Sequence, residues 1–128
     1  MKITSFNPLI VTSKAEETIA LFEALGFERR HEKTGINDED ISNVRMRYTG
    51  EDGKVFHVDV TKPSTPNDMT SIRVNVDSFD EAYEMLQEKG FKNVQGDKIT
   101  DTGSSRATMM VAPSGYTLSI AQHIKDHD

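Results

Sequence analysis

The fold is decided by a helical pattern that occurs twice, as AEETIALFEALGF at residues 15–27 and as FDEAYEMLQEKGF at residues 79–91. In each copy, apolar or small residues recur at positions i, i+3, i+4 and i+7, a spacing that gives an α-helix one apolar face. Each copy ends in Gly-Phe, and glycine readily takes the left-handed conformation that terminates a helix. Residue 79 follows residue 15 by 64 positions, so the sequence predicts an internal repeat.

The start of each helix carries a second shared feature, a capping box. The two boxes are Ser13 with Glu16 and Ser78 with Glu81. In this motif the serine hydroxyl accepts a hydrogen bond from the first turn, and the carboxylate reaches back to the serine N–H. The boxes lie 65 positions apart rather than 64, so one residue is expected to have been gained or lost near one helix start.

Segments with strand character flank both helices, one before each helix and three after it. The predicted strands are residues 9–12, 27–32, 43–49, 54–61, 71–76, 91–95, 106–111 and 116–122. The order βαβββ therefore occurs twice. We expect an α+β fold in which two βαβββ modules form a curved mixed sheet, with a ligand site in the concave cleft between them.

The organisation of the chain follows from this order. A single domain of 1–128 is predicted, with module one at 1–61 and module two at 68–122. Residues 62–67 contain two prolines and read as a linker, and 123–128 form a charged tail.

Composition excludes several function classes. The chain has 15 Lys+Arg against 21 Asp+Glu, a net charge of −6, which argues against binding to nucleic acid. No basic amphipathic stretch or long apolar run suggests a membrane. The absence of cysteine excludes disulfides, thiolate zinc sites and a cysteine nucleophile, and we expect a cytoplasmic protein.

Strand alternation separates an apolar face, expected to lie under each helix, from a polar face expected to line the cleft. The predicted ligand-binding residues on the polar faces and neighbouring strands are Arg45, Arg47, His57, Asp59, Ser71, Arg73, Asn75 and Ser119. Guanidinium groups in such a place hold a carboxylate or phosphate through paired hydrogen bonds. The alternative is cross-strand pairing, for instance of Arg45 or Arg73 with Asp59, and the sequence leaves both interpretations open.

The duplicated βαβββ order, with a helix ending in Leu25-Gly26-Phe27 and a final turn at residues 112–116, resembles the vicinal oxygen chelate superfamily. That superfamily includes glyoxalase I, the fosfomycin and bleomycin resistance proteins and extradiol dioxygenases. The resemblance spans residues 3–122 and implies a glyoxalase-like fold. It also implies a homodimer, which is common among similar proteins.

Catalytic members of the superfamily bind a divalent metal with His and Glu side chains. The resemblance places the ligand positions at Phe6 or Asn7, His57, Ser71 and Ser119. Only His57 is a strong ligand among these, because hydroxyl groups bind divalent ions poorly at neutral pH. Asp59 lies on the same strand face as His57 and is a further candidate metal ligand. We therefore expect no cofactor, with a divalent metal at His57 as the alternative.

Three functions fit these observations. The first is a glyoxalase-like or bleomycin-resistance-like protein that binds a small polar or anionic organic molecule without the family metal. The second is a metal-dependent lyase, isomerase or dioxygenase with an altered ligand set around His57 and Asp59. The third is a non-catalytic interaction domain. The sequence assigns no catalytic residue and leaves open whether a reaction is catalysed.

Overall fold

The computed structural model describes residues 1–35 and 41–124. The chain divides into two compact units, each containing one βαβββ repeat. The repeat-one unit is Asn7–Thr70, and the repeat-two unit combines Met1–Phe6 with Ser71–Asp128. None of the described helices has the length and apolar character needed to cross a membrane.

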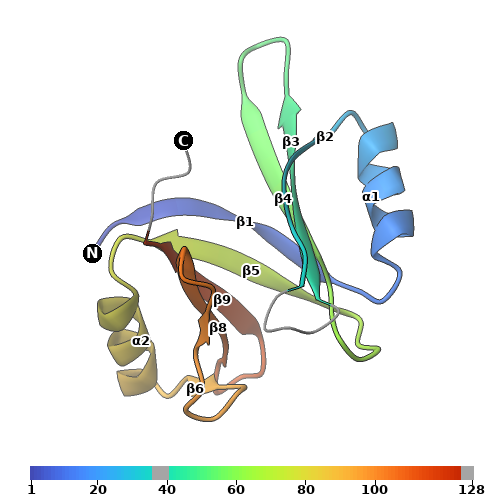
Figure 1. The fold of residues 1–128 in the computed structure, drawn as a ribbon. Coiled ribbons are helices and arrows are strands. Elements are labelled where there is room, and N and C mark those ends of the chain that lie inside the picture. Colours follow the sequence, from blue (N-terminus) through green and yellow to red (C-terminus); the bar gives the residue numbers. More distant parts are fainter. Residues whose placement is uncertain (36–40, 125–128) are drawn as a thin grey trace. The chain divides into compact units, whose positions relative to one another are not determined.

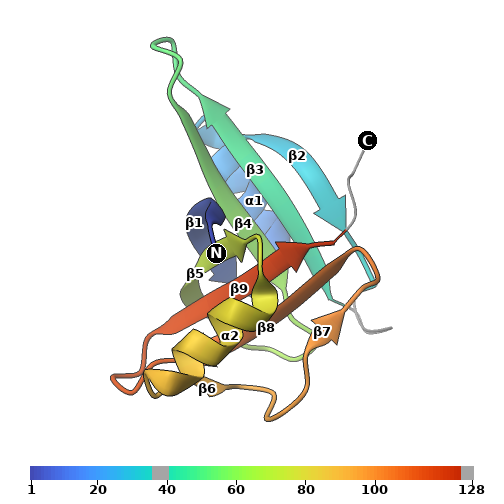
Figure 2. The same cartoon turned by 90° about the vertical axis from the view of Figure 1, so that its left-hand side faces the viewer.

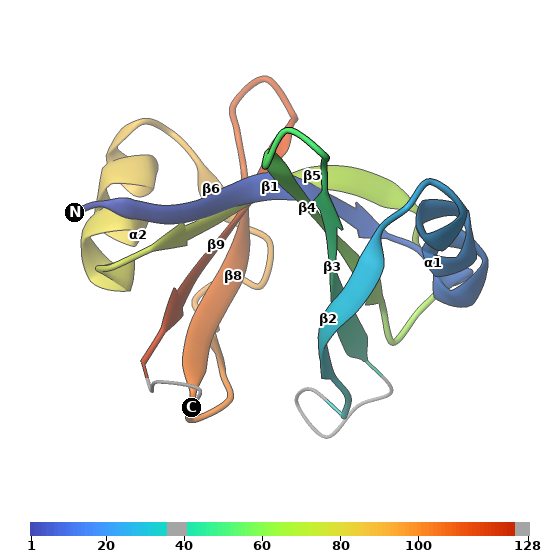
Figure 3. The same cartoon turned by 90° about the horizontal axis from the view of Figure 1, so that it is seen from above.

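The repeat-one unit is a mixed sheet with one helix. Its elements are β1 (Ile3–Val11, which begins in the other unit), α1 (Ala15–Ala24), β2 (Glu28–Lys33), β3 (Ser42–Thr49) and β4 (Val55–Lys62). The strand order is β2-β3-β4-β1, in which β1 runs parallel to β4 and the other pairs are antiparallel. Helix α1 lies on one side of these strands (Figure 1, Figure 3).

The repeat-two unit repeats this arrangement. Its elements are β5 (Met69–Val76), α2 (Phe79–Glu88), β6 (Lys92–Asn93), β7 (Thr100–Asp101), β8 (Ser105–Val111) and β9 (Thr117–His123). The order is β5-β9-β8-β6, with β7 also paired to β8, and β5 runs parallel to β9. Figure 2 shows α2 lying across β8 and β9. The predicted α+β fold with two βαβββ repeats is confirmed, although β7 lies in a stretch predicted to be a loop.

One face of each sheet packs against its helix, as the alternation predicts. The repeat-one core consists of Ala15, Ile19, Val44, Met46, Val58 and Val60. The repeat-two core consists of Val74, Val76, Phe79, Ala82, Leu86, Met110 and Ile120. In both hairpins the strand residues in the core have even numbers, so the odd-numbered residues of β3, β4, β8 and β9 face away from the helix.

The two helices begin 64 positions apart, as predicted, but only α2 has a serine cap. The Ser78 hydroxyl accepts a hydrogen bond from the Glu81 N–H at 3.4 Å. The residue that caps α1 is Lys14, which makes no side-chain capping bond. Lys14 lies 64 positions before Ser78, so no residue is gained or lost at the helix start.

The predicted capping box at Ser13 is therefore wrong, and its two polar groups bond elsewhere. The Ser13 N–H donates to Asp68 Oδ1 at 3.2 Å, and the Glu16 carboxylate pairs with Arg29 at 3.0 Å. Both partners are distant in sequence, which explains why the local pattern was misleading.

The predicted glycine terminators are confirmed at both helices. Gly26 has φ +106° and Gly90 has φ +90°, in the left-handed region that side chains disfavour. A Cβ at Gly26 would also lie 3.0 Å from the Tyr48 ring, and one at Gly90 would lie 3.0 Å from Pro113. Each glycine is thus required both by its backbone conformation and by a close neighbour.

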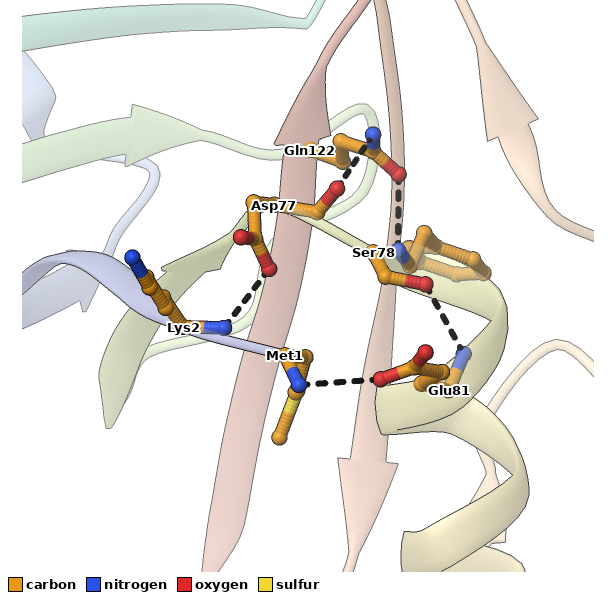
Figure 4. Close-up of polar contacts among 7 residues, drawn as sticks. Met1, Lys2, Asp77, Ser78, Glu81 and Gln122 are labelled. Carbon is orange, nitrogen blue, oxygen red and sulfur yellow. Dashed lines mark hydrogen bonds and ion pairs between the residues drawn. The ribbon is translucent and has the colours of Figure 1, made fainter.

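The start of the chain belongs to the repeat-two unit because of specific polar contacts (Figure 4). The Lys2 N–H donates to Asp77 Oδ1 at 2.6 Å, and the Asp77 N–H donates to the Lys2 carbonyl at 3.0 Å. The Gln122 amide then joins the Asp77 carbonyl (2.9 Å) to the Phe79 N–H (2.7 Å). These bonds connect residue 2, the entry to α2 and the end of β9.

Candidate ligand-binding site

The β3–β4 hairpin carries a row of polar cross-strand pairs on the face opposite α1. The antiparallel register sets Arg45 opposite Asp59 and Arg47 opposite His57. Residues paired directly across two strands have neighbouring side chains on one face. The structure thus brings together four of the predicted site residues within the repeat-one unit.

Arg45 is the centre of this row. Its Nε lies 3.2 Å from Asp59 Oδ1, and its Nη2 donates to Asn7 Oδ1 at 2.6 Å. Asp59 is 2% exposed and Asn7 is 4% exposed, so both oxygens lie in the interior. The cross-strand pairing of Arg45 with Asp59, one of the two interpretations of the sequence, is confirmed.

The amide of Asn7 is held in one orientation. Its Nδ2 donates to the Pro8 carbonyl at 2.8 Å, which leaves Oδ1 turned toward the Arg45 guanidinium. The sequence identified Asn7 only as an alternative metal-ligand position. Its role as an acceptor for Arg45 depends on a contact across 38 positions, which no local pattern reveals.

His57 lies beside two cations. Burial lowers its pKa below the ordinary value of 6.5, and the charges of Arg45 and Arg47 lower it further, while Asp59 acts in the opposite direction. The imidazole is therefore neutral at pH 7. A neutral imidazole has one N–H donor and one acceptor nitrogen to offer to a ligand.

A third pair, which the sequence analysis missed, extends the row. The Thr61 hydroxyl donates to Asn43 Oδ1 at 2.6 Å, and the register places these two residues opposite each other. The same alternation that identified His57 and Asp59 would have identified Thr61, since all three are odd-numbered residues of β4.

The repeat-two unit carries a smaller and less charged polar face. The Thr117 hydroxyl donates to Ser71 Oγ at 2.7 Å, and the Ser71 hydroxyl donates to the Thr117 carbonyl at 3.1 Å. In the parallel β5–β9 pair, Arg73 is level with Ser119. The predicted residues Ser71, Arg73 and Ser119 thus lie on neighbouring strands, and Thr117 was missed.

Asn75 is the fourth predicted residue in the repeat-two unit. It is 4% exposed, and its Oδ1 has no hydrogen-bond partner among the side chains and backbone that the structure describes. A buried acceptor of this kind costs free energy unless a donor reaches it.

The residues at the four metal-ligand positions do not fit the metal that the superfamily implies. The Asn7 oxygen already accepts from Arg45, and Ser71 is bonded to Thr117. Ser119 offers only a hydroxyl, and His57 is the one strong ligand. Within residues 1–35 and 41–124, no group of three or more His, Cys, Asp or Glu side chains is arranged to hold a metal ion.

The sequence matches no protein-family model and no curated protein. The structure, in contrast, matches solved ones. A Streptomyces coelicolor methylmalonyl-CoA epimerase in complex with 2-nitronate-propionyl-CoA matches with a TM-score of 0.70 and 15% identity, over 97% of this chain and 100% of that one. A Mycobacterium tuberculosis methylmalonyl-CoA epimerase matches with a TM-score of 0.67 and 15% identity, over 96% and 90% of the two chains.

A third match has a broader description. A glyoxalase/bleomycin resistance protein/dioxygenase superfamily member from Vibrio splendidus 12B01 matches with a TM-score of 0.56 and 15% identity, over 94% of this chain and 99% of that one. The chain has the fold of the vicinal oxygen chelate superfamily. At this level of identity the likeness concerns the fold, so the function must be argued from the residues of this chain.

Proposed function

We propose that the protein binds a small polar or anionic organic molecule on the polar face of the β3–β4 hairpin, without the family metal centre. The observation that carries this proposal is the row on β3 and β4, where Arg45 and Arg47 lie on one sheet face and His57 lies directly opposite Arg47. Guanidinium groups bind carboxylates and phosphates through paired N–H donors, and a neutral imidazole adds an acceptor.

One further observation supports an anionic ligand. The epimerase structure with 2-nitronate-propionyl-CoA contains an acyl-CoA, an anionic organic molecule, on the same fold. We infer the same general ligand class here, a small organic anion.

A thermal-shift screen tests this proposal. Chelator-treated protein is heated with a panel of small mono- and dicarboxylates, acyl-CoA esters and phosphate esters. We expect at least one class to raise the melting temperature with increasing concentration, since a ligand at one hundred times its Kd stabilises the folded state by about 2.7 kcal/mol. The shift should be lost in Arg47→Met, which removes a cation and leaves the Arg45–Asp59 pair intact.

Arg29→Met is the matched control, because Arg29 pairs with Glu16 rather than with the β3–β4 row. This variant should keep the ligand-induced shift. If no anion in the panel stabilises the protein, or if the shift survives in Arg47→Met, the proposal is wrong.

The remaining expectations concern the context of the protein. We propose a cytoplasmic homodimer, and light scattering of the purified full chain tests the dimer directly. Metal analysis tests the alternative function: near-stoichiometric zinc, iron, nickel or manganese that is lost in His57→Ala would favour a metal-dependent enzyme.

A further inference from the structure

We propose that the guanidinium of Arg45 occupies the place of a divalent cation among the donors Asn7, His57 and Asp59. The repeat-one unit would then carry a permanent, protein-supplied cation, held in an ion pair with the Asp59 carboxylate. This inference rests on the proposed function only for what the cation does, which is to attract the ligand anion. It goes beyond the proposed function because it names a latent metal site.

The geometry around Arg45 resembles that around a cation. Two oxygens from different strands converge on one guanidinium, Asn7 Oδ1 at 2.6 Å and Asp59 Oδ1 at 3.2 Å. Carboxylate and amide oxygens are also the ligands that hard divalent cations prefer. Both groups are almost fully buried, and the bond from Asn7 Nδ2 to the Pro8 carbonyl keeps the amide oxygen turned toward the positive charge.

A nitrogen donor completes the set. His57 precedes Asp59 by two residues on β4, so the two side chains lie on the same sheet face. The register sets His57 opposite Arg47, in the next pair on the same face after Arg45 and Asp59. One imidazole nitrogen, one carboxylate and one amide oxygen make a plausible ligand set for Zn²⁺ or Co²⁺ once the guanidinium is removed.

The guanidinium and a divalent ion exclude each other at this place. Both would use the same Asn7 and Asp59 oxygens, and two cations in a partly buried site repel strongly. The fold does not require the guanidinium, because the equivalent pair in the β8–β9 hairpin is Ala107 opposite Ala121. The cation is therefore a property of this site rather than of the βαβββ architecture.

Cobalt titration of the full, chelator-treated chain tests the proposal, with visible absorption and melting temperature as readouts. Arg45→Ala and Arg45→Met are expected to bind Co²⁺ at least tenfold more tightly than the wild-type protein. Arg45→Lys keeps a cation and should resemble the wild type. Arg29→Met removes an arginine that pairs with Glu16, outside the β3–β4 row, and should also resemble the wild type.

A second substitution locates the ion. Adding Asp59→Asn to Arg45→Met should abolish the gain in affinity, and circular dichroism verifies that each variant is folded. Arg45→Met retains much of the side-chain volume and provides the result if Arg45→Ala does not fold. The proposal is overturned if wild type and Arg45→Met bind Co²⁺ equally, or if the gain survives Asp59→Asn. Neither readout uses an organic ligand, so a failed ligand screen would not affect this result.

Discussion

The two repeats build the same hairpin with opposite chemistry at one pair of positions. In repeat one, Arg45 of β3 is opposite Asp59 of β4. In repeat two, 62 positions later, Ala107 of β8 is opposite Ala121 of β9. The first pair is an ion pair with a carboxylate that is 2% exposed, and the second is apolar.

The next cross-strand pair on the same face also contains a charged residue in repeat one and none in repeat two. Arg47 is opposite His57 in repeat one, whereas Met109 is opposite Ser119 in repeat two. Since repeat two forms its sheet with no charge at either pair, the fold does not need these charges. Replacing a buried ion pair by apolar residues is often neutral or stabilising, so stability alone does not account for the charges of repeat one.

The largest expected effect comes from breaking the ion pair on one side only. Arg45→Ala leaves the buried Asp59 carboxylate without its guanidinium, and we expect a loss of about 3 kcal/mol in the free energy of unfolding. This value is at the lower end of the usual range because the Arg45 side chain is 24% exposed. Urea denaturation of the wild type and the variant measures the loss.

The double variant Arg45→Ala with Asp59→Ala is the decisive control, since it gives repeat one the pair found in repeat two. It also removes the carboxylate that Arg45 pairs with, and we expect it to recover about 2 kcal/mol relative to Arg45→Ala. A double variant less stable than either single variant would mean that repeat one needs its ion pair for folding.

The same comparison shows what the sequence can predict. Alternation along β3, β4 and β5 assigned the core and polar faces, because a strand with one buried face must alternate. It placed Val58 and Val60 under α1, and His57 and Asp59 on the other face, using only nearest neighbours in sequence. The repeat itself followed from helical periodicity and the two terminal glycines.

The failures have a different physical origin. Ser13 has the sequence of a capping residue, but its N–H bonds to Asp68, 55 positions away. Asn7 was recognised only as a ligand position, yet its oxygen bonds to Arg45 across 38 positions. Contacts between distant residues decided both cases, and a single sequence does not encode them in a local pattern. The two-residue strand β7 depends in the same way on its pairing with β8.

The helix starts offer a second comparison with a smaller effect. Ser78→Ala removes the hydroxyl that caps α2, and we expect a loss of about 1 kcal/mol. Lys14→Ser places the same cap at the equivalent position of α1, where we expect a gain of about 0.5 kcal/mol. The gain is smaller than the loss at Ser78 because the backbone must also adjust, since ψ of Lys14 is 46° and that of Ser78 is 100°. Urea denaturation measures both, and a destabilising Lys14→Ser would show that the two helix starts are not equivalent.

The smallest expected effect is the titration of His57, whose counterpart Ser119 carries no charge at any pH. Since the folded-state pKa of His57 lies below 6.5, the unfolded chain binds the proton first as the pH falls. The contribution of His57 to stability is therefore complete above pH 6.5 and declines as the pH drops below that value. NMR titration of the imidazole measures the pKa directly.

Two variants test the cause of the shift. Arg47→Met should raise the pKa of His57 but leave it below 6.5, because burial is the largest cause of the shift. His57→Ser should remove this part of the pH dependence of unfolding. A wild-type pKa at or above 6.5 would mean that His57 is more exposed to solvent than the β3–β4 row implies, and the case for a neutral imidazole beside the two arginines would fail.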